Sequence, residues 1–171
     1  MYTHILVAVG TDTDSVTLEA AIRLARECGA RLTALHVVDP LPGQALAADC
    51  NIGYTVGVFE AYGRELAAHT IAALHAAGCA GEAHTLTLPM CGGTIGRAIA
   101  GHAQQIGADL IVVGKPHPSW LSLFEENVYK EVRHHAQVPV LVATDTMPAA
   151  SSRTLALRQP SAEKPVENAG V

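Results

Sequence analysis

Residues 114–127, GKPHPSWLSLFEEN, are the segment of this chain whose residue types and position most favour a ligand-binding site. They follow the apolar run DLIVV and precede VYKEVRHHA, which has helical periodicity. A glycine at the end of a buried strand, with a helix to follow, often holds a phosphate group in α/β proteins. The chemistry to test is therefore binding of a nucleotide phosphate, with Gly114 as the first candidate residue.

Several residues of the same segment oppose phosphate binding. Pro116 and Pro118 carry no backbone N–H, so two potential donors are missing. Glu125 and Glu126 place negative charge near the position that a phosphate would occupy. A carboxylate and a phosphate charge about 5 Å apart repel by on the order of 3 kcal/mol at an effective dielectric constant of about 20. Lys115 offsets part of this repulsion. The residue types therefore favour weak binding of a triphosphate.

Trp120 and Phe124 are the two large aromatic side chains of the segment, in a chain with only 4% aromatic residues. They could stack on a base, form an exposed patch for a protein partner, or fold back to hold the segment in place. The sequence favours the last of these, because the segment has few glycines and needs other contacts to fix it.

Neither a catalytic motif nor a metal-ligand pattern is evident, so we predict no catalytic residues and no metal site. The chain lacks G-x-S-x-G, H-E-x-x-H and G-x-x-x-x-G-K-[S/T]. His134 and His135 are adjacent, and neighbouring residues of a helix point in different directions. No two cysteines have C-x-x-C spacing, which predicts free thiols in a reducing compartment. The cysteines are Cys28, Cys50, Cys79 and Cys91.

Strands and helices alternate along the chain, and these elements must position any site. Apolar, β-branched runs predict strands, and the residues between them have helical periodicity. Residues 41–56 are small and polar without periodicity and predict a loop. The predicted strands are 4–10, 31–40, 82–90, 108–114 and 138–144, and the predicted helices are 16–29, 57–78, 92–107 and about 123–136.

This alternation predicts an α/β fold with a parallel sheet, a doubly wound three-layer sandwich of five strands. With 171 residues the chain is long enough for one such domain. We place the domain at 1–145 and interpret 146–171, which is rich in Ala, Ser and Pro, as a mobile C-terminal tail. The net charge of -5 argues against nucleic acid and acidic membranes as partners. No signal peptide and no membrane span are expected, because every apolar run has only the length of a strand.

Four segments together resemble the universal stress protein (UspA-like) family: HILVAV, LTALHVVDP, GADLIVVG and VRHHAQVPVLVA. The resemblance covers about residues 2–144. It implies a five-stranded parallel sheet of order 3-2-1-4-5, like that of adenine nucleotide alpha hydrolases and of flavodoxin-like doubly wound folds. It also implies a homodimer and a cytoplasmic stress-response role, with one branch of the family binding ATP and another not.

The motif of the ATP-binding branch, G-x-x-G-x(9)-G-[S/T], is only partly present. Gly114 matches the first glycine, and the second falls on His117. The final pair falls on Glu126–Asn127 or on Asn127–Val128, depending on the direction of counting. The family's Asp at the end of the first strand falls on Gly10. Asn127 keeps a capping side chain, so binding of an anion at the start of the next helix remains an alternative.

We therefore predict a protein that acts by binding and association, with a degenerate nucleotide site and no cofactor. The alternative is a stress switch that binds ATP or another adenylate in the same crevice, and a third hypothesis is an enzyme that uses the crevice for other chemistry. A protein partner other than a second copy is also left open. The candidate nucleotide-binding residues are Val9, Gly10, Val37, Val113, Gly114, His117, Asn127 and Val128.

The last strand predicts a homodimer. In order 3-2-1-4-5 it lies at a sheet edge, and VPVLV contains no charge that would prevent pairing. Two copies could pair antiparallel about a two-fold axis. We expect Val138, Val140 and Val142 to pack across that axis, and Leu141 or Val142 to tolerate no charge there.

Overall fold

The computed structural model describes residues 1–10, 16–39, 52–89, 93–114 and 128–143. The predicted site residues His117 and Asn127, the aromatic pair Trp120 and Phe124, and the C-terminal tail lie outside these ranges. The strands are β1 (His4–Ala8), β2 (Arg31–Val38), β3 (Gly81–Thr87), β4 (Leu110–Val113) and β5 (Val140–Val142). The helices are α1 (Val16–Cys28), α2 (Ile52–Ala76), α3 (Ile95–Ile106) and α4 (Val128–His135).

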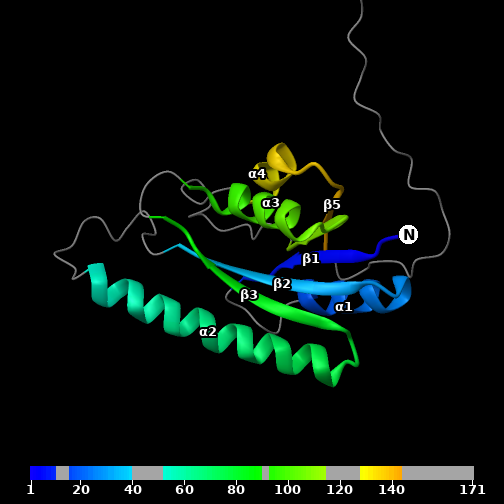
Figure 1. Ribbon diagram of the computed structural model, residues 1–171, viewed down its shortest axis with the longest axis horizontal. Helices are drawn as coiled ribbons and strands as arrows, with labels where there is room; N and C mark the ends of the chain where they lie inside the picture. The colour runs from blue at the N-terminus through cyan, green and yellow to red at the C-terminus, as the bar shows by residue number, and fades with distance from the viewer. Residues whose placement is uncertain (11–15, 40–51, 90–92, 115–127, 144–171) are drawn as a thin grey trace, which may run out of the picture.

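The five strands form one parallel sheet of order β3-β2-β1-β4-β5, which confirms the predicted fold class. β1 is the central strand and pairs with β2 on one side and with β4 on the other. β3 and β5 are the two edges. Helices α1 and α2 lie on one face and α3 and α4 on the other, as Figure 1 shows.

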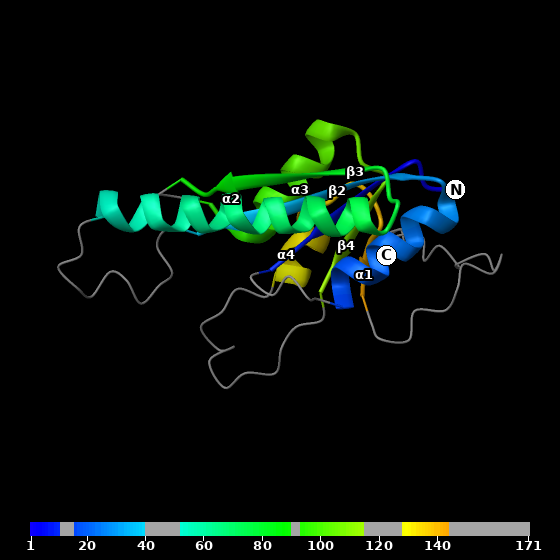
Figure 2. The same cartoon turned by 90° about the horizontal axis from the view of Figure 1, so that it is seen from below.

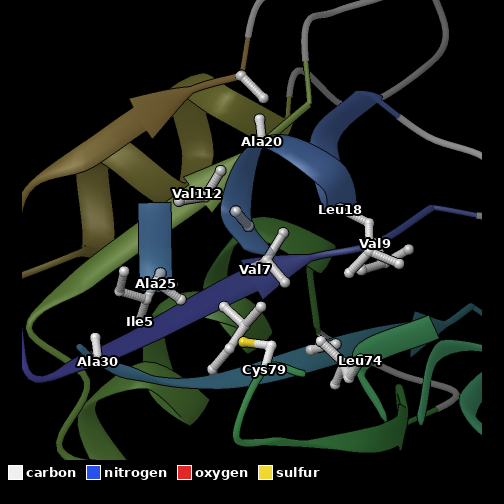
Figure 3. Close-up of a cluster of buried hydrophobic side chains, with 14 of the residues drawn as sticks. Ile5, Val7, Val9, Leu18, Ala20, Ala25, Ala30, Leu74, Cys79 and Val112 are labelled. Carbon is white, nitrogen blue, oxygen red and sulfur yellow. The ribbon is translucent and has the colours of Figure 1, made fainter. Parts of the chain in front are cut away.

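Each face of the sheet has its own apolar core. On the face of α1 and α2, side chains such as Ile5, Val7 and Leu32 pack with Leu18 and Leu74 from the helices (Figure 3). On the other face, strand residues of β1, β2 and β4 pack with Ile99 and Ala103 of α3 and Val132 of α4. Because β1 and β4 are buried from both sides, their sequences are continuous apolar runs rather than alternating ones.

Two of the helix ends carry residue types that favour capping. The backbone N–H of Arg97 donates to Thr94 Oγ1 at 3.3 Å, so Thr94 is the N-cap of α3. Gly29 follows α1 with φ of 64°, a backbone conformation that favours glycine. The prediction was wrong for α2, which begins at Ile52 and not at Gly57. Its first turn carries no local pattern that separates it from the preceding loop.

Candidate functional site

The predicted crevice lies at the carboxyl ends of β1 and β4. From β1 the chain passes through α1 to β2 on one side, while β4 lies on the other side and is followed by α4 and β5. The connections therefore change direction between β1 and β4, which is where open α/β sheets bind ligands. Val9 and Gly10 leave β1 at this point, and Gly114 directly follows β4.

The valines of the predicted site take part in strand pairing and in the apolar cores. The Val9 N–H donates to the Leu35 carbonyl at 3.0 Å, which extends the pairing of β1 with β2. Val9 packs into the core on the α1 side. Val37, Val113 and Val128 pack into the core on the α3 side. The structure thus brings these residues to one end of the sheet but places their side chains on two different faces.

The two glycines of the site differ in the room around them. A Cβ added at Gly10 would meet no heavy atom of the described residues within 4 Å. At Gly114 it would lie 3.0 Å from Thr17 Oγ1, so the start of α1 comes close to the end of β4. A side chain can therefore be accommodated at position 10, whereas position 114 is restricted.

His36 is a buried polar group at the same end of the sheet that the sequence did not single out. Its Nε2 lies 3.0 Å from Thr70 Oγ1, and the Thr70 hydroxyl donates to the Leu66 carbonyl at 2.9 Å. Nε2 must therefore carry the proton and donate to Thr70. In the part of the chain that the structure describes, Nδ1 of His36 is the one buried side-chain polar atom without a hydrogen-bond partner.

The environment of His36 favours the neutral ring. Burial lowers its pKa from 6.5, and the nearby backbone of Val9 opposes this shift. At neutral pH the His36 ring is therefore uncharged, and its Nδ1 is a buried acceptor nitrogen.

A second polar cluster crosses the opposite end of the sheet, on the α3 side. His4 Nδ1 lies 3.1 Å from the Ile106 carbonyl, and its Nε2 lies 2.9 Å from Thr33 Oγ1. The Thr33 hydroxyl is 3.2 Å from Glu82 Oε1. Burial lowers the pKa of His4, and the charge of Arg31 adds to this effect. The neutral ring has one N–H, which donates through Nδ1 because the Ile106 carbonyl can only accept. The single proton of the Thr33 hydroxyl is then donated either to His4 Nε2 or to Glu82 Oε1, but not to both at once.

The same cluster continues at the edge strand. Glu82 Oε2 lies 3.5 Å from His84 Nε2, and His84 Nδ1 lies 3.0 Å from His102 Nε2. Burial, and then the proximity of His84, lower the pKa of His102. The contact between the two rings needs one proton, carried by one nitrogen and accepted by the other. This hydrogen bond between β3 and α3 therefore requires that at least one of the two rings is neutral.

These clusters do not amount to a metal centre. Within the described ranges, no group of three or more His, Cys, Asp or Glu side chains could hold a metal ion. Cys28 and Cys79 are not in disulfides, while Cys50 and Cys91 lie outside the described residues. Burial raises the pKa of the Cys79 thiol, which makes it a poor nucleophile. None of the described helices combines the length and hydropathy that a membrane span requires.

The model of the "Universal stress protein family" matches residues 1–144. The chain belongs to the universal stress protein family. No curated protein sequence matches this universal stress protein. Among solved structures, it is similar to a universal stress protein family member from Burkholderia pseudomallei, with 29% identity and a TM-score of 0.65 over 82% of this chain and 95% of that one.

Two further relatives share the fold. Universal stress protein UspA from Lactobacillus plantarum is 25% identical, with a TM-score of 0.61 over 84% of this chain and 98% of that one. A universal stress protein family member from Arabidopsis thaliana, solved with AMP bound, is 20% identical, with a TM-score of 0.55 over 82% of this chain and 90% of that one. Membership of the family assigns no catalytic activity to this universal stress protein.

Proposed function

We propose that this universal stress protein acts in the cytoplasmic stress response by binding and association rather than by turnover, and that its nucleotide crevice no longer binds ATP tightly. The observation that carries this proposal is the sequence after β4. There Pro116 and Pro118 remove N–H donors, and Glu125 and Glu126 add negative charge. The glycines and the hydroxyl residue that complete the phosphate motif of the family are missing, and only Gly114 remains.

The end of β1 supports the same conclusion. The ATP-binding branch of the family is expected to have an Asp where this chain has Gly10. Because a Cβ at Gly10 would meet no heavy atom within 4 Å, packing among the described residues does not force the loss of the carboxylate. The crevice therefore departs from the ATP-binding pattern at both of the strands that form it.

The second candidate function is an adenylate-binding switch. The Arabidopsis thaliana relative was solved with AMP bound. In this chain, the unpaired Nδ1 of the buried His36 is an acceptor at the same end of the sheet, and a ligand N–H could satisfy it. A monophosphate would also meet less repulsion from Glu125 and Glu126 than a triphosphate, since it carries less charge.

Association is proposed to occur through the edge strand β5. Pro139 O accepts from the Ile111 N–H at 3.0 Å, and the Ala143 N–H donates to Val113 O at 2.8 Å, so these residues direct their backbone toward β4. In a parallel ladder the alternate residues Val140 and Val142 direct theirs to the open side. A second β5 could accept and donate at these positions and form a homodimer.

The packing of the edge residues supports backbone pairing over side-chain packing for such a dimer. The side chains of Val138, Val140 and Val142 pack partly against the α3 core, and Leu141 packs on the α1 side. The expected packing of the three valines across a two-fold axis is therefore replaced, in this proposal, by backbone pairing along the edge.

The experiment is a ligand and stability measurement on the freshly purified chain. We expect the mass spectrum of released ligands to contain no stoichiometric nucleotide, and millimolar ATP with magnesium to raise the melting temperature by no more than about two degrees. A dissociation constant of about 10 μM would stabilise the protein by about 2.7 kcal/mol at a hundredfold excess, which corresponds to several degrees. A shift of that size with ATP would overturn the proposal. The same shift with AMP alone would establish the adenylate switch.

A further inference from the structure

The helix α2 is apolar on more than the side that faces the sheet. It packs on β2 and β3, and its inner face is formed by Gly63, Leu66, Thr70 and Leu74, all buried. Yet Val58 and Tyr62 on another side of the same helix are 50% and 46% exposed. A helix with apolar residues beyond its buried stripe is usually covered from more than one side.

The exposed residues of α2 include a stripe with a regular spacing. Each member is separated from the next by four, three, four, three and four residues in turn, which is the spacing of a helix–helix contact. All six are exposed, and we call them the α2 stripe: Val58, Tyr62, Glu65, His69, Ala72 and Ala76.

The α2 stripe matches itself in the antiparallel direction. Its spacing is the same from either end, so a two-fold axis between Glu65 and His69 places each residue opposite another member. Val58 then faces Ala76, and Tyr62 faces Ala72, so a large side chain meets a small one at every apolar position. Glu65 of each copy faces His69 of the other, an acid against a base. Within one chain these two side chains are already 4.0 Å apart.

The surface beside the small end of the α2 stripe is hollowed. A groove of about 860 Å³ runs between α1 and the C-terminal half of α2. Its apolar lining includes Leu18, Ile22, Ala73, Ala76 and Ala77, and arginine and glutamate side chains of α1 complete it. Figure 2 shows α1 beside the C-terminal half of α2, while the N-terminal half extends past it. The projecting Val58 and Tyr62 and the groove therefore lie at opposite ends of one helix.

We propose that the α2 stripe is an interface with a second copy of this chain, in which two α2 helices pair antiparallel and each places Val58 and Tyr62 against the groove of the other. Both contacts form at once because the arrangement is two-fold symmetric. The interface is independent of the proposed pairing of β5, because α2 covers β2 and β3 while β5 is the far edge of the sheet. A chain that uses both surfaces would form tetramers or longer assemblies rather than dimers alone.

Disulfide trapping tests the register directly. In the double variant Tyr62→Cys with Ala72→Cys, the two positions are ten residues apart on one helix, about 15 Å, too far to bridge within a chain. In the antiparallel pair they lie opposite each other. We expect mild oxidation to give a covalent dimer for the double variant, with the 62–72 linkage found by peptide mapping. Each single variant and the parent chain should lack that linkage. No 62–72 linkage in the double variant would overturn the proposal.

A charge substitution on two alanines of the same helix provides the matched comparison. Ala76 lies in the α2 stripe, whereas Ala68 is also exposed but lies about 80° away around the helix. We expect Ala76→Glu to weaken self-association about tenfold or more, because it would bury a carboxylate in an apolar contact. Ala68→Glu should leave it within about twofold of the parent. Sedimentation velocity, with circular dichroism to verify folding, measures both. Equal behaviour of the two variants would contradict the proposed interface.

Discussion

Nε2 of His36 on β2 lies 3.0 Å from the hydroxyl of Thr70 on α2, and both side chains are buried. The contact joins residues 34 apart in sequence and fixes the rotation of α2 on the sheet. It also defines which ring nitrogen carries the proton, since the Thr70 hydroxyl is already donating to Leu66. This rotation determines which residues of α2 face outward.

Thr70→Val should destabilise the protein by about 1–3 kcal/mol, because it leaves the buried His36 Nε2–H without an acceptor. Thr70→Ser keeps the hydroxyl and removes one methyl group, so it should lose only about 0.8 kcal/mol. Urea unfolding midpoints of the two variants give the comparison. If Thr70→Val proves as stable as Thr70→Ser, the hydrogen bond contributes nothing.

Stability should decrease as the pH falls below about 6.5, the ordinary pKa of histidine. Burial lowers the pKa values of His4, His36 and His102 in the folded chain. The unfolded state therefore binds more protons than the native state in the window between the unfolded and folded pKa values, and unfolding is favoured there. Urea titrations at pH 7.5 and pH 5 measure the difference. The variant His102→Gln should show a smaller decrease, and a decrease as large as that of the parent would exclude His102 as a contributor.

Two glycines of α3 should respond to alanine in opposite directions. A Cβ at Gly96 would clash with Glu131 Cβ on α4, whereas one at Gly101 would meet no atom of the described residues within 4 Å. Gly96→Ala should therefore destabilise the protein by about 1–3 kcal/mol through overpacking. Gly101→Ala should stabilise it by about 0.4–1 kcal/mol by restricting the unfolded chain. The melting temperatures of the two variants, compared with that of the parent chain, test both expectations. A stabilising Gly96→Ala would show that α3 and α4 are not held so close together.

Pairing through β5 should depend on the outward backbone group of Val142. Val142→Pro removes that N–H and leaves the Ala143 bond to β4 in place. We expect it to abolish association at this edge with little loss of stability, while Val142→Ile keeps the N–H and should associate like the parent. Sedimentation of both variants, made together with Ala76→Glu so that the α2 stripe is also blocked, isolates the edge. Identical sedimentation of the two would indicate that β5 does not pair.

The sequence predicted the strand order and most of the elements because their signals are local or shared with the family. β1 and β4 are short apolar runs, and Thr94 and Gly29 have the residue types of helix ends. The start of α2 was missed because its first six residues include two glycines and three β-branched residues, and the contacts of the helix with β2 and β3 come from the fold.

The candidate site was predictable only as a location. The carboxyl ends of β1 and β4 follow from the topology, but the pairs His36–Thr70 and His84–His102 depend on how each helix is rotated on its strands. No spacing in the sequence reports that rotation. The exposed stripe of α2 was equally hidden, because that helix is apolar on several sides and periodicity does not identify its outer face.

The central position of β1 has a consequence for synthesis on the ribosome. β1 is made long before β4, yet the two strands pair, and the His4 N–H donates to Asp109 Oδ1, 105 residues later, at 3.1 Å. An emerging chain that ends before Leu110 leaves one side of β1 without a partner strand. Such nascent chains expose an apolar strand edge for as long as translation takes to reach β4. Pauses before β4 has left the ribosome should make the chain depend on ribosome-associated chaperones, whereas pauses after it has emerged should not.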